Sequence, residues 1–155
     1  MTGQIYFEDV EAGSELMPLE KVATTLMLVR WAGAIGDDNP LHYEGEFAVA
    51  QGVGRPIVHG SLKSAWLIQL MTDWTGEEGE LKKLSCQYRG IDYPRQMKTM
   101  SEPHDGETWW CRGVVSKKYV KNEENLVECK IWVENGKKVK TTIGTALVSL
   151  PSRDI

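Results

Sequence analysis

The sequence predicts an α+β fold in which an antiparallel β-sheet, late in the chain, wraps around one long buried helix. Two patterns carry this prediction. The segment from Gly60 to about Gly76 has apolar residues on almost every side of a helix, whereas from residue 81 onward apolar residues recur at every second position. A surface helix has a single apolar stripe, so the first pattern indicates a helix enclosed on several sides. The alternation indicates strands packed on one face, and together these patterns are typical of a layered α+β fold.

An earlier helix and a loop precede the buried helix. Thr24 or Thr25 could cap this helix, which carries the apolar residues Leu26, Val29, Ala32 and Ala34. It runs into a loop containing aspartate and histidine. A glycine-rich passage at residues 51–56 follows, and its flexibility could serve ligand access.

The second half of the chain is expected to be strand and turn. The turn candidates are Asp105-Gly106, residues 122–125 and residues 134–136, of which Asn135-Gly136 is the firmest hairpin signal. The strand candidates are Leu81–Tyr88, Gln96–Ser101, Glu107–Tyr119, Leu126–Val133 and Lys138–Leu150.

Composition excludes several classes of protein. The chain has 155 residues, 41% of them hydrophobic and 26% charged, so we expect one globular domain over residues 1–155. A net charge of −4 without a basic stripe argues against nucleic-acid binding. No apolar stretch reaches the ~20 residues of a membrane span, and the first residues lack a basic start followed by an apolar run. We therefore expect no membrane partner and a cytoplasmic location.

The cysteines fit that location. Cys86, Cys111 and Cys129 are odd in number, far apart and flanked by strand-like sequence, which favours reduced thiols over disulfides or metal ligands. No Cys-x-x-Cys or clustered histidine pattern indicates zinc, so we expect no metal site.

The most informative segment is residues 36–42, in which Asp37 and His42 are five positions apart with Pro40 between them. On an ideal helix these two side chains would point about 140° apart. Pro40 disfavours helix at the preceding residue, so the segment must run as a loop that can aim both groups at one point. A carboxylate and an imidazole that converge on a water form an acid/base pair. Alternatively, Asp-Asp-Asn-Pro is simply a turn that ends a helix.

The chain resembles the MaoC-like dehydratases, or (R)-specific enoyl-CoA hydratases, of the hotdog fold. Their signature, Gly-Asp-x-Asn-Pro-aliphatic-His followed after five residues by Ala or Ser, is met by residues 36–42 and by Ala48. A second hallmark, aliphatic-His-Gly at the start of the central helix, is met by Val58, His59 and Gly60. The resemblance covers nearly the whole chain and favours the catalytic interpretation of the loop over the plain turn.

The resemblance implies a hydro-lyase that adds water reversibly to a trans-2-enoyl thioester and gives an (R)-3-hydroxyacyl thioester. Asp37 and His42 would share the roles of base and acid, and the Gly60 N–H would bind the thioester oxygen. Asn39 is expected to fix the loop more than to touch substrate. The substrate would be carried as a CoA or acyl-carrier-protein thioester, and no metal or redox cofactor is required.

Other residues could contact substrate. Ile35 stands where the family usually has a small residue, and it could narrow the pocket or desolvate Asp37. Ser61 replaces a common methionine and bears on the shape of the acyl pocket. Arg55 could meet a CoA phosphate or a substrate carboxylate. His59 is expected to be a structural hydrogen-bonding residue, and His104 to lie in an exposed turn.

A hotdog sheet alone leaves an edge and part of its helix uncovered, so we expect a homodimer, or a higher oligomer, with the acyl pocket near the subunit boundary. A separately encoded partner stays open. Two other functions also stay open: a hotdog acyl thioesterase, and a non-catalytic acyl-thioester-binding subunit of a hetero-oligomer.

Overall fold

The computed structural model describes residues 3–153. Two short 3₁₀ turns, η1 and η2, accompany three helices and five strands. In chain order the elements are η1 (Phe7–Asp9), β1 (Leu19–Lys21), α1 (Thr25–Ile35), η2 (Pro40–His42), α2 (Gly45–Ala50), α3 (Gly60–Thr75), β2 (Glu80–Tyr88), β3 (Trp109–Lys121), β4 (Glu124–Glu134) and β5 (Lys140–Ser149).

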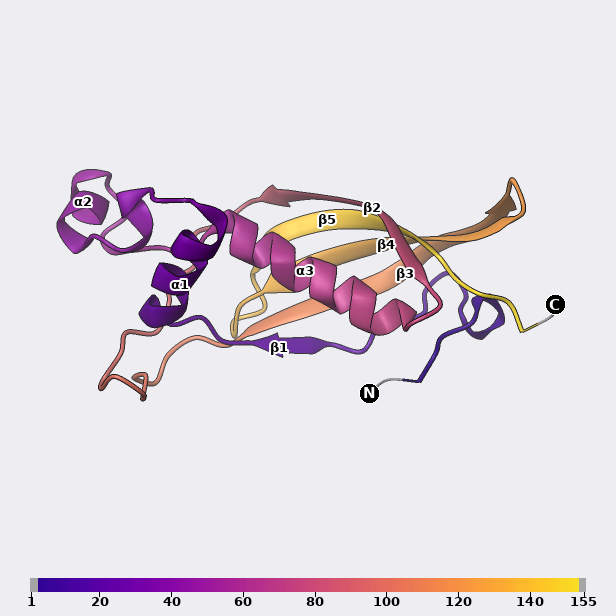
Figure 1. Ribbon diagram of the computed structural model, residues 1–155, viewed down its shortest axis with the longest axis horizontal. Helices are drawn as coiled ribbons and strands as arrows, with labels where there is room; N and C mark the ends of the chain where they lie inside the picture. The colour runs from indigo at the N-terminus through magenta and orange to yellow at the C-terminus, as the bar shows by residue number, and fades with distance from the viewer. Residues whose placement is uncertain (1–2, 154–155) are drawn as a thin grey trace.

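The five strands form one antiparallel sheet in the order β1-β3-β4-β5-β2. The sheet curls along the length of α3, and α1 and α2 gather at the end where α3 begins (Figure 1). The 3₁₀ turn η1 lies toward the opposite end, where Phe7 N–H donates to Pro151 O in the segment after β5. The α+β architecture predicted from the sequence, a late antiparallel sheet around one long helix, is therefore confirmed.

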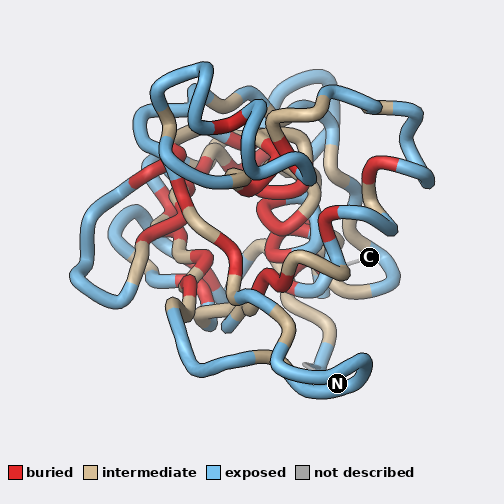
Figure 2. Tube along the Cα trace, turned by 90° about the vertical axis from the view of Figure 1, so that its left-hand side faces the viewer, coloured by how far each residue is buried: buried red, intermediate tan, exposed pale blue. Residues whose placement is uncertain are grey.

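The core lies between α3 and the sheet, where buried segments gather inside a shell of exposed loops (Figure 2). Leu67 and Met71 of α3 are fully buried, and so are Val127 and Val133 of β4. Burial at every second position of β4 matches the alternation in the sequence. Fully burying a side chain of this size contributes roughly 1.5–3 kcal/mol, so the α3–sheet contact is the main stabilising layer.

Both hairpins within the meander occur where turns were predicted. Asn122 and Glu123 form the two-residue connection between β3 and β4 with φ of 51° and 64°, as a type I′ turn requires. The β4–β5 connection is longer than a two-residue turn, because Lys138 N–H donates to Asn135 O and Asn135 N–H donates to Val139 O. Lys138, rather than Gly136, has the positive φ of 61°.

One predicted strand is wrong. Residues 96–101 form an irregular segment whose one β-bridge joins Met97 to Pro103. The reason is local: the Thr99 hydroxyl accepts hydrogen bonds from the N–H groups of Ser101 and Glu102, which closes a tight turn. Conversely, the three-residue β1, which pairs with β3, was not predicted.

The cysteines are free thiols, as expected. Burial raises the pKa of Cys111 to about 12 and that of Cys129 to about 12, so both stay protonated at neutral pH. Cys86 is partly exposed. Over residues 3–153, no helix combines the length and the apolar character needed to cross a membrane.

Candidate active site

The loop between α1 and α2 places the predicted acid and imidazole. Gly36 ends α1 in the left-handed conformation with φ of 71°, and its N–H donates to Ala32 O. Asn39 then caps η2, since its side-chain oxygen accepts a hydrogen bond from Leu41 N–H at 3.0 Å. Pro40 opens η2, where its missing N–H costs no hydrogen bond. The chain therefore leaves the helix before Pro40, as the sequence predicted.

Asp37, His42 and His59 meet beside the start of α3. Asp37 Oδ2 lies 3.8 Å from His42 Nε2 and 4.0 Å from His59 Nε2. The two imidazole rings are stacked, with centroids 3.6 Å apart and planes 19° apart. The Asp37 side chain is 39% exposed, whereas that of His42 is 10% exposed and that of His59 is fully buried. The Asp37 carboxylate is therefore accessible to solvent, whereas the two imidazole rings beside it are buried.

His42 presents a nitrogen lone pair to Asp37. Its Nδ1 lies 2.8 Å from Ile57 O, and because a carbonyl only accepts, Nδ1 must carry the proton. In neutral His42, Nε2 is then an acceptor, as is the ionised carboxylate that faces it. At 3.8 Å the two acceptors are too far apart for a direct hydrogen bond, but a donor such as water could bridge them.

His59 differs from the sequence expectation of a structural hydrogen-bonding residue. Within residues 3–153 neither of its ring nitrogens has a hydrogen-bond partner. Its side chain does not cap α3, although His59 occupies the N-cap position. Burial lowers the pKa of His59, and the neighbouring His42 adds to this effect while Asp37 opposes it. His59 is therefore held in its neutral form.

The ligand atoms of the same three residues all lie within 4.8 Å of one another, close enough to suggest a metal site. Zinc requires nitrogen ligands at about 2.0–2.1 Å, with the metal along each lone pair. Lone pairs of imidazole lie in the ring plane, and two rings stacked 3.6 Å apart have nearly parallel planes. One ion cannot lie in both planes, so this arrangement fits acid/base chemistry better than metal binding.

Gly60 is the first residue of α3, and its N–H is one of the groups that have no partner within a helix. The positive end of the helix dipole adds to the field at this point. A Cβ at Gly60 would come within 2.7 Å of the Tyr88 ring, so a larger residue here would have to displace that side chain. The geometry suits a donor for a developing oxyanion.

The remaining predicted contacts are spread around this centre. The backbone N–H of Asn39 lies 3.4 Å from Asp37 Oδ1, in addition to its capping role. Ile35, the last residue of α1, is 44% exposed. The Ser61 hydroxyl accepts a hydrogen bond from Trp31 Nε1 at 3.0 Å, which ties α1 to the start of α3. Substrate contact by Ile35, Asn39 and Ser61 stays a prediction.

Arg55 lies apart from the Asp37–His42–His59 cluster. Its guanidinium stacks on the Tyr93 ring, 4.6 Å from the centroid, and lines a separate cavity of about 280 Å³. His59 is four positions after Arg55, so their Cα atoms are at most about 14 Å apart. His104, which lines the same cavity, is exposed as expected.

Sequence reasoning missed a buried ion pair one turn into α3. Lys63 Nζ lies 2.8 Å from Asp92 Oδ2 and donates to Gly90 O at 3.1 Å, and both charged side chains are at most 3% exposed. The Asp92 carboxylate also accepts hydrogen bonds from Trp109 Nε1–H and from the Thr141 hydroxyl. The backbone oxygen of Asp92 accepts a hydrogen bond from Val58 N–H, just before His59. This network fixes the start of α3 to the sheet.

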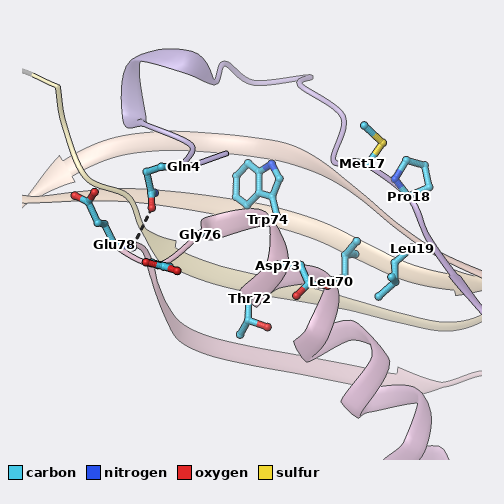
Figure 3. Close-up of a pocket in the computed structure, with 11 residues that line it drawn as sticks. Gln4, Met17, Pro18, Leu19, Leu70, Thr72, Asp73, Trp74, Gly76 and Glu78 are labelled. Atoms are coloured by element: carbon cyan, nitrogen blue, oxygen red, sulfur yellow. Dashed lines mark hydrogen bonds between the residues drawn. The ribbon is translucent and has the colours of Figure 1, made fainter. Parts of the chain in front are cut away.

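A cavity of about 700 Å³ lies near the C-terminal end of α3 (Figure 3). Leu70 and Trp74 line it together with Leu19, and Asp73, Glu77 and Glu78 add carboxyl groups. Asp37, His42 and Gly60 are not among its lining residues. Its carboxyl groups would repel an anionic ligand such as a phosphate.

Comparison with known proteins supports the fold and the family. The family model described as "MaoC like domain" matches residues 14–126. No curated protein matches the chain. Among solved structures, an (R)-hydratase from A. caviae involved in PHA biosynthesis is similar with a TM-score of 0.76 and 20% identity, over 93% of this chain and 99% of that one.

Two further structures show the same likeness. The R-hydratase PhaJ1 from Pseudomonas aeruginosa, in the unliganded form, gives a TM-score of 0.79 at 19% identity, over 97% of this chain and 88% of that one. A chain of the ChsH1-ChsH2 complex from Mycobacterium tuberculosis gives a TM-score of 0.72 at 21% identity, over 90% of this chain and 98% of that one. These matches confirm the hotdog fold predicted from the sequence.

Proposed function

We propose that this chain, which belongs to the MaoC-like domain family, is a hydro-lyase that adds water reversibly to a trans-2-enoyl thioester. The product would be the (R)-3-hydroxyacyl thioester. One observation carries the proposal: a carboxylate oxygen and an imidazole nitrogen converge to 3.8 Å beside the start of a helix. The fold likeness to (R)-hydratases, at about 20% identity, supports the reaction class.

The pair would act on one water molecule. A water between Asp37 Oδ2 and His42 Nε2 donates one O–H to each acceptor, which turns a lone pair of its oxygen toward the substrate. The oxygen forms a bond to C3 while one of its protons passes to the pair, and C2 receives a proton from the pair. No net charge is left on the enzyme, and positioned proton transfer of this kind contributes about 10²–10⁴-fold to a rate.

The start of α3 would stabilise the charge that develops on the thioester oxygen. As C3 is attacked, electron density moves through C2 to that oxygen, giving an enolate-like transition state. The Gly60 N–H is fixed by its helix and needs no reorganisation to donate. Removal of one such donor typically costs about 3 kcal/mol.

We propose CoA as the carrier, with Arg55 as a partner for a phosphate. The Arg55–Tyr93 stack holds the guanidinium in place within reach of the site. Acyl carrier protein is the alternative carrier, and the length of the acyl chain is left to experiment. We place the reaction in the cytoplasm, in fatty-acid metabolism.

We also propose a homodimer. Within residues 3–153, β2 has a hydrogen-bonded neighbour, β5, on one side only. Tyr88 on this edge and Ile68 on the adjacent α3 are 53% and 44% exposed. Pairing of two copies would cover both. A hetero-oligomer, as the name of the ChsH1-ChsH2 complex describes for that protein, is the alternative that mass measurement after co-expression would reveal.

Incubation with crotonyl-CoA tests the proposal. We expect enoyl absorbance to fall without release of free thiol, and chiral analysis to give the (R)-3-hydroxy product. Release of thiol would instead identify a thioesterase, and unchanged absorbance with measurable binding would identify a non-catalytic binding subunit. A series of enoyl-CoA esters of increasing length, together with acyl-carrier-protein esters, would then define the substrate.

A further inference from the structure

The buried histidine that precedes α3 has no role in the mechanism above. His59 is 0% exposed, yet among the described residues both of its ring nitrogens lack a hydrogen-bond partner. A buried polar group without a partner costs about 1–3 kcal/mol. Native structures satisfy most such groups, and each exception requires an explanation, such as an ordered water or a catalytic role. Apolar residues pack at this depth without that cost, so packing alone does not explain a histidine here.

The surroundings of His59 identify its partner. Its Nε2 is 4.0 Å from Asp37 Oδ2, the same oxygen that lies 3.8 Å from His42 Nε2. The stacked ring of His42 presents its face, not a lone pair, to His59. Asp37 faces His59 with both its carboxylate and its backbone, each of which opposes the lowering of the His59 pKa. A movement of about 1 Å would bring Nε2 and the carboxylate oxygen to hydrogen-bond distance. Hydrogen bonds at active sites are often long until substrate binds.

We propose that His59 is a positioning residue, which carries its proton on Nε2 and donates a hydrogen bond to Asp37 Oδ2. This inference rests on the proposed function above. Asn39 N–H approaches the other oxygen of the same carboxylate at 3.4 Å. Two donors, one on each oxygen, fix the direction of the carboxylate, whose side chain is otherwise 39% exposed.

The charge state of His59 suits this role. Burial holds it neutral, so it has a single N–H, and a charge on His42 beside it reinforces that preference. A neutral donor can orient the carboxylate without forming the tight ion pair that would quench its basicity. His42, bonded through Nδ1–H to Ile57 O, has the opposite tautomer. The two stacked rings are therefore chemically different: one offers a lone pair to the reaction, and the other offers an N–H to the carboxylate.

Three substitutions separate positioning from packing. His59→Phe keeps a ring against His42 but removes both nitrogens. His59→Gln places an amide N–H near the position of Nε2, whereas His59→Asn places it near Nδ1. We expect His59→Phe and His59→Asn to lower kcat for crotonyl-CoA hydration by about 10²-fold, as a misplacement of about 1 Å can. KM should change less than kcat, and His59→Gln should retain most of the wild-type kcat.

The outcomes also separate this inference from the function on which it rests. If the wild type hydrates crotonyl-CoA and His59→Phe does so equally well, the ring only packs and the inference is wrong. Rescue by asparagine instead of glutamine would overturn the assignment to Nε2. If the wild type has no hydratase activity, the proposed function fails first.

A measurement on the wild-type protein depends neither on activity nor on the folding of a variant. The chain has three histidines, so their imidazole nitrogen chemical shifts can be assigned by NMR on labelled protein. In the neutral form of each ring, we expect the proton of His42 on Nδ1 and that of His59 on Nε2. A proton on Nδ1 of His59 would contradict the proposal, because that tautomer cannot donate to Asp37.

Discussion

The ion pair between Lys63 and Asp92 should be the most sensitive single point of the fold. At 2.8 Å and an effective dielectric constant of about 20, the attraction between the two charges is about 6 kcal/mol. Removal of the two charges from water offsets much of this gain. Substitution of Lys63 by methionine leaves the desolvation penalty of the Asp92 carboxylate without its counter-charge. We expect the free energy of unfolding to fall by about 3–5 kcal/mol.

Urea unfolding followed by far-UV circular dichroism measures this change. For a chain of this size the same loss lowers Tm by about 10 °C. The matched control is the double variant Lys63→Met/Asp92→Asn, which removes both charges and keeps an amide oxygen for Trp109 Nε1–H. Because no uncompensated charge remains, we expect the double variant to be more stable than Lys63→Met alone.

Two results would refute this reasoning. A free energy of unfolding for Lys63→Met within about 1 kcal/mol of wild type would show that the buried carboxylate needs no counter-charge. A double variant less stable than the single one would show that the hydrogen bonds of the Asp92 carboxylate, rather than its charge, dominate the network.

Three other predictions follow from single observations. Thr24→Ala removes the hydroxyl that caps α1, so we expect urea unfolding to show a loss of about 1 kcal/mol, with Thr24→Ser unchanged. Iodoacetamide at pH 8 should alkylate Cys86 before the buried Cys111 and Cys129, and mass spectrometry of peptides would show equal labelling if burial does not protect them. His59, whose pKa is lowered on folding, takes up its proton more readily in the unfolded chain, so stability should fall as pH drops from about 6.5 toward its folded-state pKa. His59→Gln should reduce this fall, and an identical pH dependence of unfolding in the two proteins would contradict the assignment.

The regular elements could be predicted because their patterns are local. Alternating burial in β4 is visible in the sequence and confirmed by the structure. The long helix α3 was also predicted, but its enclosure on several sides is wrong: its buried residues, such as Leu62, Trp66 and Leu70, lie on one face, and Ile68 outside that face is 44% exposed. The loop from Gly36 to His42 was predictable for the same reason, since Pro40 dictates the end of the helix. In contrast, β1 is only three residues long and shows no periodicity to detect. The prediction of a strand at residues 96–101 failed because hydrogen bonds accepted by the Thr99 hydroxyl outweighed weak alternation.

The buried polar contacts could not be predicted, because they join residues distant in sequence. A lysine on a helix is normally exposed. The burial of Lys63 is explained by the Asp92 carboxylate beside it. No local sequence pattern indicates that the Trp31 indole N–H donates a hydrogen bond to Ser61. His59 was expected to be a structural residue with its hydrogen bonds made, which is the ordinary role of a buried histidine. Within residues 3–153 its ring nitrogens have no hydrogen-bond partner, and this corrects the expectation.

The central claim is that Asp37 and His42 act together on one water. The most direct measurement compares kcat for crotonyl-CoA hydration in Asp37→Asn, His42→Gln and the double variant. If the two residues act as a unit, each single change lowers kcat by about 10²-fold or more, and the double change costs little beyond either one. Single variants close to wild type, or losses that simply multiply in the double variant, would contradict the account.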